Sequence, residues 1–188
     1  MAKSNFRYIF IKKTKKVFHN WVFTGIMKKD FSDGGKRMKI MFICTGNTCR
    51  SAMAYGLAKK IVDTKGLDIE IYSAGIYAAT GEHASYNSVA VMKEYDVDIA
   101  LHKATNIEES NIEEMDLILC ATLSHKLQII AKYKNLKDKT FTMKEYAGLD
   151  NNKTDLDIKD PWGNNMNTYR MCAAEISLCV DKIIEKIS

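Results

Sequence analysis

Two cysteines stand five residues apart in the stretch ICTGNTCRSAM, residues 43–53. Cys44 ends an apolar run, and Arg50 and Ser51 directly follow Cys49. Two thiols in a loop rich in Gly, Asn and Thr could form a metal knuckle, a disulfide, or a nucleophile inside an anion-binding loop. Each of these chemistries makes different demands on the rest of the chain.

The metal knuckle is the weakest of the three interpretations. Zinc requires a second pair of ligands, and no further CxxC or HxxxH pair occurs in the sequence. We therefore expect neither a metal nor a cofactor. Five cysteines cannot all pair within the chain, and no signal peptide of the usual form opens it, so we expect free thiols and a cytoplasmic protein. A reversible disulfide remains an alternative.

A nucleophile in an anion-binding loop explains most of the motif. A Gly-containing turn that opens a helix directs several backbone N–H groups into one concavity, where the helix dipole adds positive potential. Cys44 is expected at the floor of this concavity, where the field favours its nucleophilic thiolate. Arg50 adds a planar pair of donors that matches two phosphate oxygens. The loop residues expected around the anion are Thr45, Gly46, Asn47, Thr48 and Cys49.

Three further polar residues complete this interpretation. Ser51 can hydrogen-bond the sulfur, and Asn47 can brace the bent loop, although both could be simple helix caps. The only proline of the chain lies in IKDPWGNN, residues 158–165. Asp160, which precedes that proline, places a carboxylate on a stiffened loop. Alone it indicates a turn, but beside a cysteine nucleophile it predicts a general acid that later activates water.

The elements that must position these residues alternate along the chain. Apolar or alternating runs predict strands over residues 39–44, 68–75, 115–122 and 139–143. Helical spacing predicts helices over residues 51–66, 83–96, 124–133 and 167–187. This alternation predicts a doubly wound α/β fold of the flavodoxin-like kind, in which helices flank a four-stranded parallel sheet in three layers. Ligands of such sheets bind beyond the carboxyl ends of the strands, where the Cys44 loop lies.

Composition limits the partners. The 188 residues suit one domain, and the formal charge of +5 is uneven. Residues 1–37 carry ten Lys/Arg against two Asp/Glu, whereas residues 38–188 carry eighteen against twenty-one. Because residues 38–188 are slightly acidic, their charge does not favour binding of nucleic acid. No apolar run reaches membrane-spanning length, so we expect no stable membrane association. We expect a domain over 38–188, preceded by a basic extension, 1–37, that is either disordered or the product of a misassigned start site.

Several segments occur in order across residues 38–188: FICTGNTCRSAMA, YSAG, DLILCAT, FTMKEYAG and DPWGNNMNTYR. In these the chain resembles the low-molecular-weight protein tyrosine phosphatases, and among them the bacterial protein arginine phosphatases, which Thr48 and FTMKEY indicate. The resemblance implies a metal-independent protein phosphatase with Cys44 as nucleophile, Arg50 as phosphate clamp and Asp160 as acid and base. It implies a phosphocysteine intermediate and phosphorylated proteins as substrates, with phosphoarginine preferred and phosphotyrosine the alternative. We expect a monomer.

Other residues receive weaker assignments. Trp162 and Tyr77 are candidate walls of the substrate cleft, and Trp162 has the stronger case because it adjoins the acid. No partner is identifiable for three histidines, so we expect them at the surface or at helix caps: His83, His102 and His125. The family usually has Pro and Glu where this chain has Ala52 and Tyr55, and Tyr55 leaves local packing near the helix start in doubt.

Arsenate reductases share the expected fold and the loop, and they are the nearest rival. They need a relay of further cysteines, and Leu127 stands where the partner of Cys120 is expected. Cys172 and Cys179 are two helical turns apart, roughly 10 Å, which is too far for a disulfide. We therefore rank a reductase below a phosphatase. In similar proteins the thiol matching Cys49 protects the nucleophile as a disulfide under oxidation, and a buried structural residue is its alternative. A phosphate-binding module with little turnover is the rival from another class.

Overall fold

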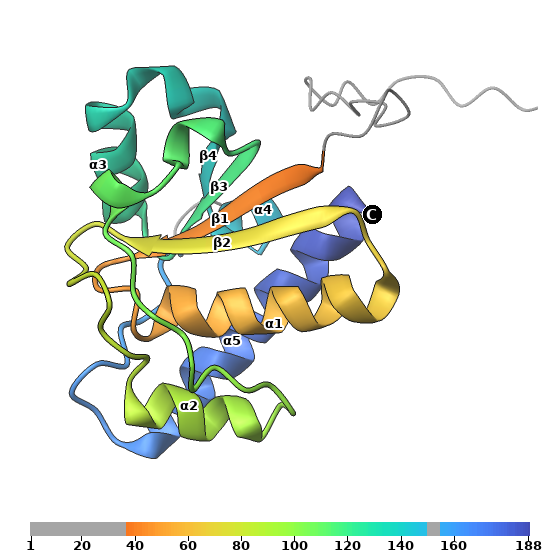
Figure 1. Cartoon of the computed structure of the whole chain (residues 1–188), viewed down its shortest axis with the longest axis vertical. Coiled ribbons are helices and arrows are strands. Elements are labelled where there is room, and N and C mark those ends of the chain that lie inside the picture. Colours follow the sequence, from red (N-terminus) through yellow and green to blue (C-terminus); the bar gives the residue numbers. More distant parts are fainter. Residues whose placement is uncertain (1–36, 150–154) are drawn as a thin grey trace, which may run out of the picture. The chain divides into compact units, whose positions relative to one another are not determined.

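The computed structural model describes residues 37–149 and 155–188. The predicted α/β fold is confirmed: four parallel strands form one sheet in the order β2-β1-β3-β4 (Figure 1). The strands are β1 (Met38–Cys44), β2 (Ile69–Gly75), β3 (Leu117–Cys120) and β4 (Thr140–Thr142). The α-helices are α1 (Arg50–Lys65), α2 (Tyr86–Lys93), α3 (Leu123–Lys132), α4 (Met143–Ala147) and α5 (Met166–Ile187).

All eight predicted elements are present, but some boundaries differ. β3 and β4 are shorter than predicted, and residues 139–143 do not form a strand throughout. Thr142 ends β4 and caps α4 instead, since its hydroxyl accepts from the Glu145 N–H while the Glu145 carboxylate accepts from the Thr142 N–H. Helix α4 was not predicted, and neither were three short 3-10 helices: η1 (Ile107–Glu109), η2 (Ile112–Glu114) and η3 (Lys134–Lys139).

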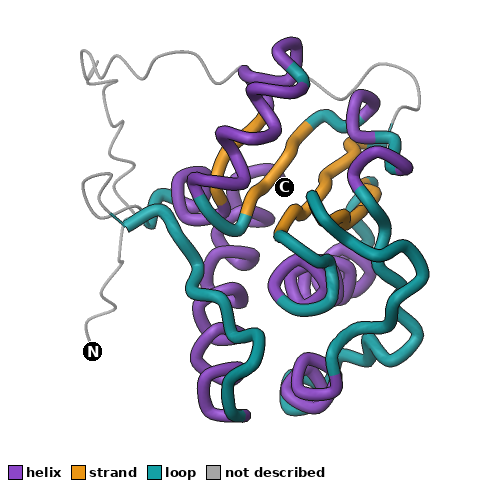
Figure 2. The backbone as a smooth tube through the Cα atoms, turned by 90° about the vertical axis from the view of Figure 1, so that its left-hand side faces the viewer, coloured by secondary structure: helices purple, strands orange, loops and turns teal. Residues whose placement is uncertain are grey.

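The central strand β1 divides the core into two layers. Ile40 and Phe42 point to the face that α1 and α5 cover, whereas Met41 and Ile43 point to the face covered by α3 and the 3-10 helices. Figure 2 shows the strands lying between these two groups of helices. Because β1 is buried on both faces, its side chains form a continuous apolar run rather than an alternating one.

The carboxyl ends of the strands meet at one edge of the sheet. Cys44 at the end of β1 is in register with Gly75 at the end of β2, and Ile43 is in register with Cys120 at the end of β3. Residues that follow these strands therefore lie side by side although they are far apart in the sequence. This edge carries the predicted anion loop.

The remaining predictions about the chain as a whole concern its N-terminal part and membranes. The extension expected over residues 1–37 lies, apart from Arg37, outside the described residues, and the boundary at residue 38 stays a prediction. Among residues 37–149 and 155–188, none of the helices combines the length and the apolar character that crossing a bilayer demands.

Candidate active site

The loop between β1 and α1 encloses the sulfur of Cys44. Cys44 is buried, and its Sγ accepts a hydrogen bond from the Asn47 backbone N–H at 3.3 Å. The Ser51 hydroxyl lies 3.0 Å from the same sulfur. Helix α1 begins directly after the loop, its N-cap Cys49 makes no side-chain capping bond, and its first turn has no acidic residue. The positive end of the helix therefore faces the loop without a neutralising side chain.

Asn47 braces the loop, as its type suggested. Its φ of 56° is in the left-handed region, which Asn tolerates better than most residues. The buried side chain donates to Ser51 Oγ at 2.8 Å and to Ser73 Oγ at 3.0 Å, and accepts from the Thr105 N–H at 2.9 Å. Three segments are thereby tied to the turn. Ser51 is held beside the sulfur and is not the cap of α1.

Arg50 lies under the loop with one donor unused. It is only 4% exposed, and its Nη1 donates to the Ile158 carbonyl at 3.2 Å. Its Nη2 donates to Thr45 Oγ1 at 3.4 Å and to Asp160 Oδ2 at 2.5 Å. Among the described residues, Arg50 Nε is the only buried side-chain nitrogen or oxygen without a hydrogen-bond partner. A buried guanidinium with an unpaired donor favours binding of an anion, because an unmet hydrogen bond costs free energy.

Asp160 reaches the clamp from a different part of the chain. Its Oδ1 accepts from the Trp162 N–H at 3.2 Å, which fixes the carboxylate on its turn, while Oδ2 faces Arg50. The chain two residues before Asp160 is held at the end of β3, since the Ile158 N–H donates to the Ala121 carbonyl at 2.8 Å. The structure thus brings the predicted acid to the predicted clamp, and about half of the Asp160 side chain stays exposed.

The segment before Asp160 has further anchors, one of them in the FTMKEY motif. The Asp157 carboxylate accepts from the Leu123 N–H at 2.7 Å, at the start of α3. The Lys144 ammonium is almost fully buried and pairs with Asp155 at 2.9 Å and with Glu175 at 2.5 Å. The motif therefore ties the acid-bearing segment to α4 and α5.

Gly75 allows β2 to approach the loop closely. A Cβ atom at this position would lie 2.6 Å from the Thr45 carbonyl oxygen and 2.8 Å from the Asn47 nitrogen. Both are backbone atoms and cannot move without distorting the loop. The N–H groups that follow also bind the loop backbone, since Ile76 donates to the Cys44 carbonyl and Tyr77 to the Thr45 carbonyl.

Two of the three histidines have partners in the loop that the sequence did not reveal, although His125 lies at the capped start of α3, as expected. His102 Nε2 lies 2.9 Å from the Asn47 carbonyl oxygen, and its ring is 5.7 Å from that of Tyr55. Tyr55, at a departure from the family pattern, thus packs against a residue that supports the loop. His125 is 7% exposed and lies between the hydroxyls of Thr45, 3.0 Å away, and Thr122, 2.7 Å away. His83 is exposed, as expected.

Burial sets the protonation of these two rings. Desolvation lowers the pKa of His102, and the hydrogen bond to Asn47 opposes this only in part. Desolvation and the neighbouring charge of Arg50 lower the pKa of His125 to about 4. Both rings are therefore neutral near pH 7, and neither adds positive charge to the loop.

The side chain of Cys49 contacts α2 and α5, and the backbone of Thr48 contacts the start of α2. Cys49 Sγ lies 3.4 Å from Ser85 Oγ, the N-cap of α2, and 3.5 Å from the Tyr169 hydroxyl of α5. Burial, followed by the contact with Cys49, raises the pKa of Tyr169 to about 12. Thr48 is 9% exposed and its carbonyl accepts from the Ser85 N–H. These contacts join the loop to two helices.

The two candidate wall residues are at the surface. Trp162 follows the acid by two residues, and Tyr77 follows the loop-binding end of β2. Each is 71% exposed, and the Tyr77 hydroxyl donates to Gln128 of α3. Large exposed rings next to a reaction centre are available for contact with a substrate.

The remaining cysteines do not form a reductase relay. All five cysteines are free thiols. Burial raises the pKa of Cys172 and of Cys179 to about 12, and raises that of Cys120 well above its usual range. Thiols with such values are poor nucleophiles at neutral pH. Leu127 is 57% exposed on α3 and offers no sulfur to Cys120.

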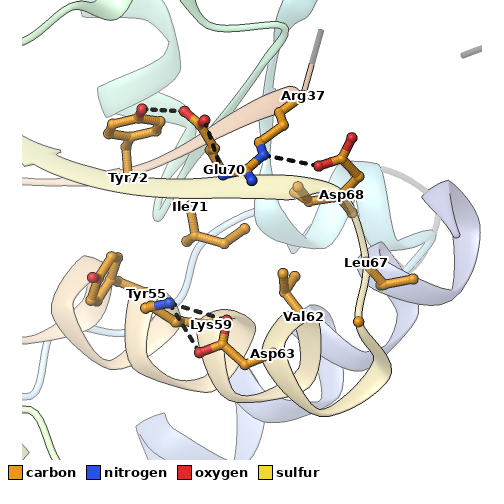
Figure 3. Close-up of a pocket in the computed structure, with 12 residues that line it drawn as sticks. Arg37, Tyr55, Lys59, Val62, Asp63, Leu67, Asp68, Glu70, Ile71 and Tyr72 are labelled. Carbon is orange, nitrogen blue, oxygen red and sulfur yellow. Dashed lines mark hydrogen bonds and ion pairs between the residues drawn. The ribbon is translucent and has the colours of Figure 1, made fainter. Parts of the chain in front are cut away.

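A hollow of about 790 Å³ lies elsewhere, between α1 and the outer strand β2 (Figure 3). Its charged lining residues neutralise one another, since Arg37 pairs with Asp68 at 3.0 Å and Lys59 with Asp63 at 3.0 Å. The chemistry of the described residues is therefore concentrated at the Cys44 loop and not in this hollow.

Sequence reasoning missed the supporting residues of the site. They are Ser73, Thr105, Ser85, Tyr169, His102 and His125. One signal was available, because Ser73 and Gly75 belong to the YSAG segment at the end of β2 and His125 follows the end of β3. In a parallel sheet, such positions share the edge that carries the ligand.

Comparison with known proteins agrees with this geometry. The family model described as low molecular weight phosphotyrosine protein phosphatase matches residues 39–188. A protein-arginine-phosphatase from Geobacillus stearothermophilus is 37% identical over 150 residues, which are 79% of this chain and 95% of the relative.

Two solved structures are also similar. The low molecular weight protein tyrosine phosphatase from T. tengcongensis is 41% identical with a TM-score of 0.73, over 79% of this chain and 99% of that one. A cysteine-to-serine mutant of the YwlE arginine phosphatase, with a phosphorylated active-site serine, is 31% identical with a TM-score of 0.73. The match covers 80% of this chain and 95% of that one.

Proposed function

The chain belongs to the low molecular weight phosphotyrosine protein phosphatase family, and from this premise we propose that it hydrolyses phosphorylated protein side chains with Cys44 as nucleophile. The observation that carries the proposal is the buried Arg50 guanidinium, whose Nε has no partner, beside a sulfur that receives hydrogen bonds. A phosphate supplies the acceptors that this donor set lacks.

In the first step the Cys44 thiolate attacks phosphorus in line with the leaving group. The S–P bond forms while the P–N or P–O bond breaks, and Asp160 gives its proton to the departing nitrogen or oxygen. The loop N–H groups and Arg50 hold the charge of the phosphoryl oxygens. Ser51, 3.0 Å from the sulfur, donates a hydrogen bond that stabilises the thiolate before attack and after release.

In the second step water attacks the phosphocysteine and Asp160 takes the proton from that water. The S–P bond breaks, inorganic phosphate leaves, and the thiolate is restored. In the absence of phosphate, Asp160 is paired with Arg50. A phosphate that takes both Nε and Nη2 of Arg50 withdraws Nη2 from Asp160, which frees the carboxyl group to face the leaving atom.

For the substrate we propose phosphoarginine. The support is the similarity to proteins named protein-arginine-phosphatase and the hydroxyl of Thr48, which replaces an apolar wall and suits a polar guanidinium. Phosphotyrosine is the second candidate, because relatives named low molecular weight protein-tyrosine-phosphatase are 33% identical. Trp162 can stack on either planar group. We also propose that the protein works as a cytoplasmic monomer without a metal.

Two variants test the mechanism. Cys44→Ser is expected to abolish turnover, because a hydroxyl at this place is not ionised. Asp160→Asn is expected to slow turnover by about 10²–10⁴-fold, the usual contribution of a general acid. This second variant should still bind vanadate, since the loop and Arg50 are intact. Full activity in Cys44→Ser would refute the mechanism.

The substrate is tested separately with phosphoarginine and phosphotyrosine peptides of one sequence. The ratio of their kcat/KM values is expected to favour phosphoarginine, and Thr48→Ile should shift this ratio toward phosphotyrosine. A clear preference of the wild-type protein for phosphotyrosine would make the Thr48 argument wrong. Binding of inorganic phosphate together with no release of phosphate from either peptide would instead indicate a binding module.

A further inference from the structure

His125 forms a bridge between two strand ends that the proposed mechanism does not use. Its Nε2 lies 3.0 Å from Thr45 Oγ1, in the anion loop, and its Nδ1 lies 2.7 Å from Thr122 Oγ1, the N-cap of α3. Thr45 directly follows Cys44, and its hydroxyl also accepts from Arg50 Nη2 at 3.4 Å. A buried polar chain thus runs from α3 to the phosphate clamp.

The position of the hydrogens follows from the number of donors and acceptors. With its pKa near 4, the His125 ring is neutral at pH 7 and has one N–H group. Thr122 Oγ1 already accepts from the His125 backbone N–H at 3.2 Å, so its own hydrogen is free to bind Nδ1. Nε2 then carries the ring hydrogen and donates to Thr45. The opposite tautomer leaves the Thr122 hydrogen without an acceptor among the described residues.

This assignment determines what the Thr45 hydroxyl can do. Its oxygen accepts two hydrogen bonds, one from His125 and one from Arg50, and both of its lone pairs are used. Its own hydrogen has no acceptor within the described residues. Thr45 is the exposed residue of a loop that is otherwise largely buried, so this hydrogen can reach a bound ligand. Because the Thr45 hydroxyl can then only donate, it favours contact with the anionic phosphoryl group of a ligand over contact with a guanidinium, which has no acceptor.

We propose that the Thr45 hydroxyl is an additional hydrogen-bond donor to the bound phosphoryl group, and that His125 is the positioning residue that orients it. The inference deepens the proposed function and rests on it, because the same loop must bind the phosphoryl group. Thr45 thereby adds a side-chain donor to the N–H groups of the loop. His125 touches no reacting atom and acts through Thr45.

The test is calorimetric titration with inorganic phosphate, which requires no turnover. Thr45→Val keeps the shape and removes the hydroxyl, and it should weaken phosphate binding about tenfold, as expected for one hydrogen bond to a charged group. Thr45→Ser keeps the hydroxyl and should bind within about twofold of the wild type. Equal affinities of Thr45→Val and the wild type would overturn the proposal.

A double-mutant cycle separates positioning from a structural role. His125→Leu should weaken phosphate binding about threefold, and His125→Gln, whose amide can donate to Thr45, should restore it. In the Thr45→Val background, His125→Leu should cause no further loss, because its effect passes through the missing hydroxyl. Losses that multiply would refute the role of His125. If His125→Leu does not fold, the comparison of Thr45→Val with Thr45→Ser decides the proposal for Thr45, and His125→Gln decides that for His125.

A turnover assay of the wild-type protein distinguishes a failure of this inference from a failure of the proposed function. If the wild-type protein hydrolyses neither phosphoarginine peptides nor phosphotyrosine peptides, the proposed function itself is contradicted. Hydrolysis together with unchanged phosphate binding in Thr45→Val would leave that function intact and contradict only the inference.

Discussion

Asn47 offers the sharpest quantitative test of how the loop is held. Asn47→Ala removes all three side-chain hydrogen bonds, to Ser51, Ser73 and Thr105, and leaves the Thr105 N–H without its acceptor. At about 1 kcal/mol for each hydrogen bond, the loss is roughly 3 kcal/mol. Alanine at a φ of 56° adds about 1–2 kcal/mol of backbone strain. We expect a decrease of about 4 kcal/mol in the free energy of unfolding.

Asn47→Gly is the matched control, because glycine accepts this φ without strain. Its greater freedom in the unfolded chain costs about 0.5–1 kcal/mol, which offsets part of the relief. Asn47→Gly should therefore be more stable than Asn47→Ala by roughly 0.5–1 kcal/mol and still about 3 kcal/mol less stable than the wild type.

Urea unfolding followed by circular dichroism measures both differences. Activity should fall with both variants, because the Asn47 N–H binds the sulfur at 3.3 Å and its place depends on the side chain. An Asn47→Ala protein within 1 kcal/mol of the wild type would refute the bracing role. A glycine variant less stable than the alanine variant would refute the strain argument.

Two further predictions concern the strand ends. Gly75→Ala should remove phosphate binding and activity, because its Cβ would lie 2.6 Å from the Thr45 carbonyl oxygen. A titration with vanadate checks this, and normal binding would show that the loop backbone can move to accept the methyl group. Stability should decrease by about 2 kcal/mol from pH 7 to pH 5, because the unfolded chain protonates His125 at its ordinary pKa, near 6.5, whereas the folded protein does so only near its lowered value of about 4. His102 acts in the same direction. Urea unfolding of wild type and His125→Gln at both pH values measures this loss, and an equal slope in the variant would contradict the assignment to His125.

The anion loop could be predicted because its residues are contiguous. Cys44 ends β1, Arg50 begins α1, and the short loop between them opens at the N-terminus of a helix, which is a ready-made anion site. Asp160 was found because a single Asp-Pro step stood out in a chain with one proline. The end of β4 could not be placed, because Thr142 serves equally as a strand residue and as the cap of α4, and only the hydrogen bonds with Glu145 decide between them.

The partners of the histidines depend on which strands are neighbours, and the sequence leaves that order open. Only when β3 lies next to β1 does the residue that caps α3 come close to the residue that follows Cys44. His125 then occupies the first turn of α3 with its ring facing Thr45. The alternation of strands and helices is compatible with other strand orders, in which the same histidine would not lie beside Thr45. A prediction for His125 therefore requires the sheet order first, and the polar contacts of the loop follow from it.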